Sequence, residues 1–207
     1  IDQIKLLGYE KKISKYLPYG KQSINKSDIN SVNKVLNSDF ITQGPKINEF
    51  EKKIASFVGS KYAVAVSSAS AGLHLSCMAY NLNKKSQLIT SPITFVSTAN
   101  AGRHCGSKIF FSDIELDTIN IDPVRLRKKL RSNNEKNLVI PVHFAGLGCD
   151  VKKISKLKKK FNFDIVEDAS HALGAKYPTG EKIGCCKYSL ATVFSSTSNC
   201  FFASSAK

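Results

Sequence analysis

The 207-residue sequence has no apolar run approaching the ~20 residues that a membrane-spanning helix needs, so we expect no membrane partner. It also lacks any Pro-, Gly- or Ser-rich run that would mark a linker. Its six cysteines form no CxxC pair and no zinc-type spacing, and no secretory leader precedes them. We therefore expect reduced thiols, no bound metal and a soluble cytoplasmic protein.

Acidic residues are also scarce, which leaves a net charge of +15, and few of the basic residues are arginine. Arginine occurs only at Arg103, Arg125, Arg127 and Arg131. Base recognition in nucleic acids favours the planar arginine fork, so a lysine-dominated excess argues against a nucleic-acid partner. The densest basic run, residues 152–161, keeps Ile154, Leu157 and Phe161 at helical spacing. This spacing predicts that its lysines occupy the opposite, solvated face.

The composition, with 42% hydrophobic and 23% charged residues, is typical of a folded globular chain. Short apolar blocks that predict strands alternate with amphipathic segments that predict helices. The expected strands are 62–66, 87–90, 108–114, 137–144 and 163–169, and the expected helices are 27–38, 45–59, 72–80, 122–130 and 152–161, with one more after Phe95. Ser27 is the expected cap of the first helix and Gly59 the expected stop of the second. This order predicts an α/β fold with a mainly parallel sheet covered on both faces.

In such sheets ligands bind beyond the carboxyl ends of the strands. The stretch "SSASAGL" (67–73) begins a helix there with small residues, which favours a phosphate held by backbone N–H groups. The stretch "EDASHALGA" (167–175) offers Glu167, Asp168 and His171, and a carboxylate there could pair with a protonated ring nitrogen. We expect one acid of the adjacent pair to face the cleft and the other to point away.

Each feature also has a purely structural interpretation. The small residues could simply begin a helix, Asp168 could cap the turn after its strand, and Phe95 could pack in the core rather than stack on a planar ring. Together the three segments describe a holder for a flat, phosphorylated, nitrogen-containing ring. The hypothesis requires Asp168 and the bend near Ser70 to converge across neighbouring strand tips.

The order of several longer blocks resembles the DegT/DnrJ/StrS-type sugar aminotransferases, which are fold-type-I enzymes that use pyridoxal 5'-phosphate (PLP). The blocks are "LPYGKQSI" (17–24), "SDFITQGPKINEFEKKIASFVGSKYAVAVSS" (38–68), "TSPITFVSTANA" (90–101), "FSDIELDTINID" (111–122), "PVHFAGLGCD" (141–150), "IVEDASHALGAKY" (165–177) and "YSLATVFS" (188–195). The stretches "ITQGP" and "EDASHALGA" are most similar to the branch that aminates UDP-linked 4-keto-6-deoxy-N-acetylhexosamines toward pseudaminic acid.

The resemblance implies a set of roles for residues of this sequence. Ala69 and Ser70 would hold the PLP phosphate, Phe95 would stack on the pyridine ring, and Asp168 would pair with its nitrogen. His171 would lie beside the ring's phenolic oxygen, and Ser195 would reach the phosphate or the substrate. The implied sugar-nucleotide residues are Tyr19, Asp39, Phe40, Ile41 and Thr42. The resemblance also implies glutamate as amino donor and a homodimer.

The position of the cofactor-linking lysine departs from the family pattern. After "TVFS" the family has two residues, two variable positions and then the lysine, and here that lysine position holds Cys200. An imine requires an amine, so a cysteine cannot replace this lysine, and we expect no catalytic residue and no activity in the chain as written. Related dehydratases carry histidine at the lysine position, but no histidine follows His171.

The resemblance implies three segments: an N-terminal arm and first helix (1–37), an incomplete PLP-binding large domain (38–195) and a divergent tail (196–207). The expected fold is a truncated fold-type-I large domain with a seven-stranded-type, mainly parallel sheet and helices on both faces. The absent small C-terminal domain suggests a frameshift or a truncated product. Two other functions stay open at this point: a non-catalytic protein that binds pyridoxamine phosphate (PMP) or a sugar nucleotide, and a basic nucleic-acid binder.

Overall fold

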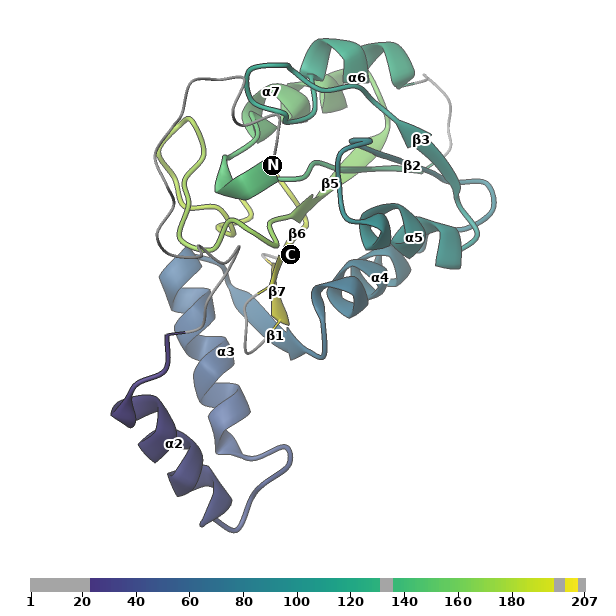
Figure 1. Ribbon diagram of the computed structural model, residues 1–207. Helices are drawn as coiled ribbons and strands as arrows, with labels where there is room; N and C mark the ends of the chain where they lie inside the picture. Colours follow the sequence, from purple (N-terminus) through teal and green to yellow (C-terminus); the bar gives the residue numbers. More distant parts are fainter. Residues whose placement is uncertain (1–22, 131–135, 196–199, 205–207) are drawn as a thin grey trace, which may run out of the picture. The chain divides into compact units, whose positions relative to one another are not determined.

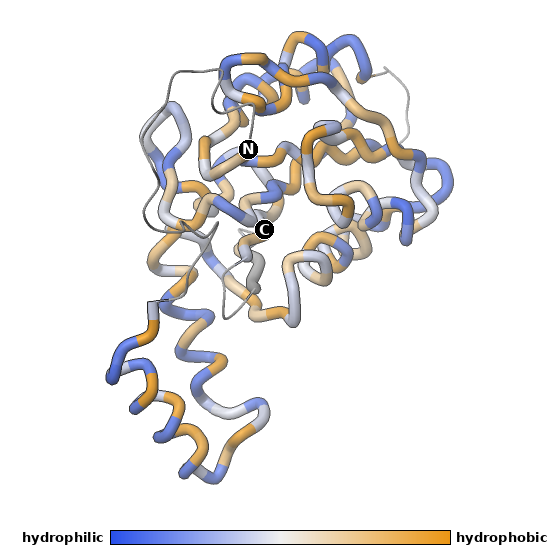
Figure 2. The backbone as a smooth tube through the Cα atoms, viewed as in Figure 1, coloured by the Kyte–Doolittle hydropathy of each residue, from blue (hydrophilic) through white to orange (hydrophobic). Residues whose placement is uncertain are grey.

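The computed structural model describes residues 23–130, 136–195 and 200–204, and the chain divides into two compact units, Ile1–Ile41 and Thr42–Lys207. The described part of the first unit is built on helix α2 (Lys26–Leu36). Its N-cap is Asn25 rather than the expected Ser27, because the Asn25 side chain accepts from the backbone N–H groups of Ser27 and Asp28. The Asp28 carboxylate accepts from the Asn25 N–H in return, which completes a capping box. The apolar stripe of α2 is exposed (Figure 2).

The second unit contains a seven-stranded sheet in the order β1-β7-β6-β5-β4-β2-β3 (Figure 1). The strands are β1 (Tyr62–Val66), β2 (Gln87–Thr90), β3 (Lys108–Phe111), β4 (Asn137–Ile140), β5 (Phe163–Asp168), β6 (Ala191–Ser195) and β7 (Cys200–Ser204). Strand β7 is antiparallel to both of its neighbours, and the other pairings are parallel. The expected α/β fold with a mainly parallel, seven-stranded sheet is confirmed.

Strand β7 lies within the segment expected to be a divergent tail. It inserts between β1 and β6, with Cys200 in register with Val66 on one side and Ser195 on the other. The sequence hypothesis assumed that β1 and β5 are neighbours. This was wrong, because β7 and β6 separate them. Strand β1 was also expected to be buried, but it is a sheet edge, and Tyr62 and Val64 are exposed.

Helices cover both faces of the sheet, as Figure 1 shows. They are α3 (Pro45–Val58), α4 (Ala69–Ala79), α5 (Val96–His104), α6 (Pro123–Lys129) and α7 (Val151–Lys156), with 3-10 turns η1 (Phe144–Gly146) and η2 (Leu157–Lys159). Helix α3 begins at Pro45 and ends at Gly59, which adopts the left-handed conformation at φ 80°. Asp122 caps α6 through the N–H groups of Val124 and Arg125. These signals were legible in the sequence.

Alternate residues of each central strand enter two separate cores, because successive side chains of a strand point to opposite faces. Ile165 packs in the core that includes residues of α3, α6 and α7, whereas Val166 packs in the core beneath α4 and α5. This alternation fixes which residues at the end of β5 face which helices.

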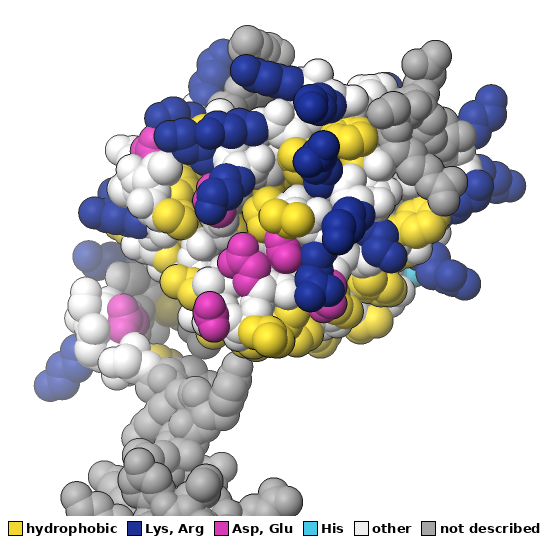
Figure 3. All heavy atoms as spheres, turned by 90° about the horizontal axis from the view of Figure 1, so that it is seen from above, with side chains coloured by type: hydrophobic (Ala, Val, Ile, Leu, Met, Phe, Trp, Pro, Cys, Tyr) yellow, Lys and Arg dark blue, Asp and Glu magenta, His cyan; other side chains and the backbone are white. Residues whose placement is uncertain are grey.

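The lysine-rich segment follows the expected division of faces. Ile154 of α7 is fully buried, whereas Lys152, Lys153 and Lys156 are exposed. Figure 3 shows lysine and arginine side chains spread widely over the surface of the molecule seen from above. The basic run is therefore a solvated helix face.

Candidate active site at the carboxyl edge of the sheet

The two adjacent acids at the end of β5 face opposite sides of the sheet. Asp168 is 3% exposed and meets Thr98 of α5, so it lies on the face that α4 and α5 cover. Glu167 is fully buried and meets His143 and Tyr177 on the other face. The expected division of the pair is confirmed, and Asp168 is the acid on the side of the small-residue bend.

Asp168 is held by three hydrogen bonds. Its Oδ2 accepts from the Thr98 hydroxyl at 2.7 Å. Its Oδ1 accepts from the Ser170 hydroxyl at 2.6 Å and from the Ser170 N–H at 3.2 Å. The strand end itself is fixed by the main chain, where Asp168 N–H donates to Pro141 and Asp168 carbonyl accepts from His143. The carboxylate is thus an oriented acceptor at the carboxyl edge of the sheet.

The bend near Ser70 is the first turn of α4. Ser68 is the N-cap, and its hydroxyl accepts from the Ala71 N–H at 3.1 Å. Gly72 lies against the sheet, since a Cβ there would be 3.0 Å from Val193 of β6 and 3.5 Å from Val66 of β1. Helix α4 therefore packs over the strands that separate β1 from β5. The N–H groups at such a helix start have no partners in the helix and can bind an anion.

Phe95 is the N-cap residue of α5 and is 73% exposed, so it does not pack in the core. The next residues, Val96 and Ser97, line a cavity of about 300 Å³ together with Ser70 and Ala71. This cavity lies between α4 and α5 and is also lined by His74 and His104, but not by Phe95 or Asp168. Because Phe95 is exposed, its ring is available for stacking.

The other expected site residues, His171, Ser195 and Cys200, lie at or just after the ends of strands. His171 is exposed in the turn after β5, and its carbonyl lies 3.0 Å from the place where Gly146 would carry a Cβ. Ser195 is half-buried at the carboxyl end of β6. Cys200 begins β7 beside Ser195, so the expected lysine position lies at the same edge of the sheet as the ends of β1 and β6.

The residues expected to meet a sugar nucleotide are divided between the two units. Asp39, Phe40 and Ile41 are exposed and belong to the first unit, whereas Thr42 is exposed and begins the second. Tyr19 lies outside the described residues.

Sequence reasoning missed the buried polar cluster around Glu167. Tyr177 donates to both carboxylate oxygens at 2.9 Å, Thr192 donates at 3.1 Å, and Ser189 also donates. The Cys149 N–H donates to His143 Nδ1 at 3.0 Å, so the ring proton is on Nε2 and is directed at Glu167, 2.8 Å away. The usable sequence signal was Glu167, an acid that directly follows the apolar Ile165 and Val166 of β5.

Burial, reinforced by the Glu167 carboxylate, raises the pKa of the Tyr177 phenol far above its ordinary value. The phenol therefore remains a proton donor at neutral pH. Burial likewise raises the pKa of the Cys186 thiol to about 12, and this thiol lies beside Thr192. The cluster is a buried network of hydrogen bonds around the Glu167 carboxylate.

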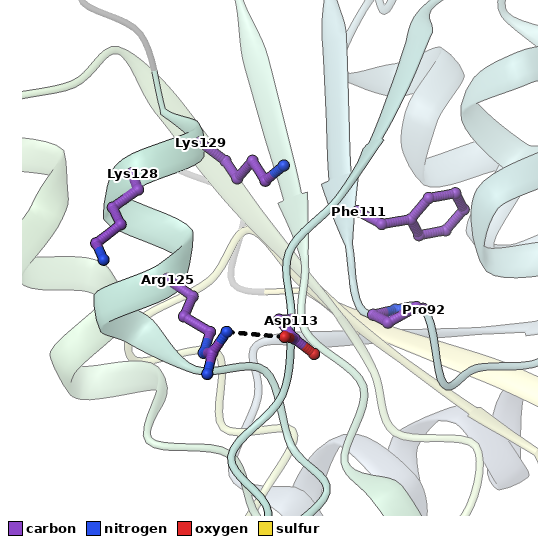
Figure 4. A pocket seen from close by; sticks show the side chains of 6 residues that line it. All are labelled: Pro92, Phe111, Asp113, Arg125, Lys128 and Lys129. Atoms are coloured by element: carbon purple, nitrogen blue, oxygen red, sulfur yellow. Dashed lines mark hydrogen bonds and ion pairs between the residues drawn. The ribbon is translucent and has the colours of Figure 1, made fainter.

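A second cavity, of about 400 Å³, lies between α6 and the ends of β2 and β3 (Figure 4). Arg125 turns toward Asp113, with 2.9 Å between nitrogen and oxygen, and its Nε is 3.5 Å from Asp122. The arginine is thus already paired with carboxylates. Within the described ranges, no group of three or more metal-ligating side chains is found, and no helix is long and apolar enough to cross a membrane.

Solved structures that match this fold include sugar aminotransferases with bound PLP or PMP. Helicobacter pylori PseC, an aminotransferase involved in pseudaminic acid biosynthesis, matches with a TM-score of 0.82 and 31% identity over 93% of this chain and 53% of that chain. The PLP form of the Streptococcus pneumoniae sugar aminotransferase Spr1654 matches with a TM-score of 0.83 and 25% identity, over 92% of this chain and 53% of that one. The fold defines the class as that of PLP-dependent aminotransferases.

The model of the DegT/DnrJ/EryC1/StrS aminotransferase family matches residues 22–204, and the chain belongs to this family. The match extends past residue 195 and includes β7. A UDP-4-amino-4,6-dideoxy-N-acetyl-beta-L-altrosamine transaminase of Campylobacter jejuni is 40% identical over 81% of this chain and 44% of its own length. The Bacillus subtilis spore coat polysaccharide biosynthesis protein SpsC is 41% identical over 78% of this chain and 41% of its own length. The chain spans less than half the length of these curated relatives.

Proposed function

We propose that this chain is the cofactor-binding part of an aminotransferase for nucleotide-linked 4-keto-6-deoxy sugars, with a UDP-linked N-acetylhexosamine as substrate and glutamate as amino donor. The relatives in Campylobacter and Helicobacter support this substrate class. The single observation that carries the proposal is the oriented Asp168 on the same face and edge as the first turns of α4 and α5.

The donor set of this edge fits PLP or its amine form. Ala69 and Ser70 would hold the phosphate at the start of α4, Phe95 would stack on the ring, and Asp168 would accept a hydrogen bond from the ring nitrogen. His171 would contact the phenolic oxygen, and Ser195 would contact the phosphate or the substrate. When bound, the protonated ring supplies an electron sink for bond cleavage at the amine carbon.

The site as written fits cofactor binding but not its covalent attachment. Cys200 at the lysine position offers a thiol in place of an amine, and the missing amine also removes a proton carrier that typically contributes ~10²- to 10⁴-fold. We expect no amino transfer by the 207-residue chain. A non-catalytic protein that binds PMP or a sugar nucleotide is the second candidate, and the cysteine at position 200 is the observation that favours it.

We also propose a cytoplasmic homodimer as the working form, with Asp39, Phe40, Ile41, Thr42 and Tyr19 on the sugar nucleotide. Helices α4 and α5 present Leu75, Met78 and Val96 to solvent, with exposed fractions of 46%, 53% and 61%, and these side chains support a protein partner on that face.

Calorimetry with PMP tests the proposal, because PMP needs no lysine to bind. Replacing Asp168 by Asn removes a charge-assisted hydrogen bond of about 1.5 to 3 kcal/mol, so PMP affinity falls about 10- to 100-fold. Asp164→Asn is the matched control, since Asp164 is on the same strand and pairs with Lys158 instead. Equal affinities in D168N, D164N and the unchanged protein would contradict the proposed site.

A further inference from the structure

Among the described residues, Thr98 supplies the only hydrogen bond that a neighbouring element makes with the Asp168 side chain. It is fully buried in the first turn of α5, and its hydroxyl donates to Asp168 Oδ2 at 2.7 Å. The two donors on Oδ1 both come from Ser170, two residues along the chain. Thr98 therefore ties the end of β5 to α5.

The direction of the hydrogen bonds follows from the number of available protons. A hydroxyl has one proton, and an ionised carboxylate can only accept. Because the Thr98 proton is directed at Asp168, the 2.7 Å contact between the hydroxyls of Thr94 and Thr98 must be donated by Thr94. Thr94, Thr98 and Asp168 thus form a short chain of hydrogen bonds with one direction, from the half-buried Thr94 inward.

The same counting shows which carboxylate oxygen is open. A carboxylate offers about four acceptor positions, two on each oxygen. Ser170 fills both positions on Oδ1, and Thr98 fills one on Oδ2. Within the described ranges, one acceptor position remains, and it is on Oδ2.

We propose that Thr98 is a positioning residue that holds Asp168 so that Oδ2 presents its one open acceptor position to the ring nitrogen of the cofactor. The inference rests on the proposed function and deepens it. Phe95 stands three residues before Thr98, and the Thr98 N–H donates to its carbonyl at 3.0 Å. One helix start therefore places the stacking ring and aims the carboxylate together.

The experiment compares PMP with its 1-deaza analogue, in which a C–H replaces the ring nitrogen. Thr98→Val keeps the shape and removes the hydroxyl, so PMP affinity falls about tenfold, as for one buried hydrogen bond. Affinity for the deaza analogue stays unchanged, because that ligand makes no bond to Oδ2. Thr98→Ser retains the hydroxyl and restores PMP binding.

Thr90→Val is the matched control. Thr90 is equally buried, and its hydroxyl donates to the Ile140 carbonyl at 2.7 Å, away from Asp168. It should lose stability without changing the ratio of the two affinities. Thr94→Val, at a half-buried position, should lower PMP affinity selectively but less, even where Thr98→Val folds poorly.

The outcomes distinguish a failure of the positioning role of Thr98 from a failure of the proposed function. Equal losses for both ligands in Thr98→Val, or no loss in Thr98→Val and Thr94→Val, would overturn the positioning role while PMP binding by the unchanged protein still supports the proposed function. Failure of the unchanged protein to bind PMP would contradict the proposed function and this inference with it.

Discussion

At the scale of single residues, the adjacent acids Glu167 and Asp168 do different work because a strand turns successive side chains to opposite faces. Asp168 lies at the carboxyl edge of the sheet, and among the described contacts one acceptor position of its carboxylate is unoccupied. Glu167 lies inside the core, where its carboxylate accepts hydrogen bonds from several donors. The same dipeptide thus contributes one residue to the candidate site and one to the rigidity of the strand beneath it.

Replacing Glu167 by Gln should lower the free energy of unfolding by about 2 to 4 kcal/mol. The amide N–H₂ would face at least one group that also donates, and His143 cannot reverse its role because Nδ1 already accepts from Cys149. Urea unfolding at neutral pH measures the loss. Glu181→Gln is the control, since Glu181 is half-buried and pairs with the exposed Lys187, so its loss should be smaller. A Glu167→Gln protein as stable as this control would show that the cluster does not stabilise the fold.

Residue patterns along the chain indicated the two acids, Phe95 and the helix start near Ser70 as candidates, but they left open whether Phe95 is exposed or packs in the core. They could not indicate Thr98 as the partner of Asp168, or His143 and Tyr177 as partners of Glu167. These contacts join residues 70, 24 and 10 positions apart, and they arise only when strands and helices pack. Local periodicity contains no information on such pairs.

At the scale of elements, local signals were sufficient where a cap or stop is chemically specific. Asp122 with Pro123 fixed the start of α6, and Gly59 fixed the end of α3. The cap of α2 was assigned to Ser27 instead of Asn25, because either side chain can cap a helix and only geometry separates them. Strands β6 and β7 were both absent from the strands expected from apolar blocks, and the five residues of β7 follow no alternation that the sequence analysis could use.

Two left-handed glycines allow a matched test of packing at the turn before β6. Gly59 and Gly184 have φ values of 80° and 97°, but a Cβ at Gly59 would be 3.9 Å from its nearest neighbour, whereas one at Gly184 would be 2.6 Å from the Phe194 ring. Gly59→Ala should cost about 1 to 2 kcal/mol from backbone strain alone. Gly184→Ala should cost about 1 to 3 kcal/mol more because of the clash. Thermal unfolding followed by circular dichroism measures both. Equal losses would mean that the turn relaxes away from Phe194.

At the scale of the whole molecule, the class of fold was legible, but the order of the strands was not. Apolar blocks alternating with amphipathic helices predict a parallel sheet, yet nothing in such a pattern places β7 between β1 and β6. That insertion separates β1 from β5, and helix α4 packs through Gly72 against both Val66 of β1 and Val193 of β6. The site therefore depends on the path of a helix as well as on strand neighbours.

The lysine excess also belongs to this scale. It is spread over exposed helix faces such as that of α7, while the apolar residues of the same helices fill the cores. A high positive charge is thus compatible with the aminotransferase fold. The assignment to the family rests on the match over residues 22–204 and not on the charge.

A crystal structure of the chain with PMP tests most directly whether one ligand contacts both Asp168 and the helix start at Ala69 and Ser70. The account predicts the ring nitrogen within hydrogen-bonding distance of Asp168 Oδ2, the phosphate on the N–H groups of Ala69 and Ser70, and the Phe95 ring stacked on the pyridine. A PMP molecule bound elsewhere, or bound at Ser70 with Asp168 turned away from its ring, would contradict it.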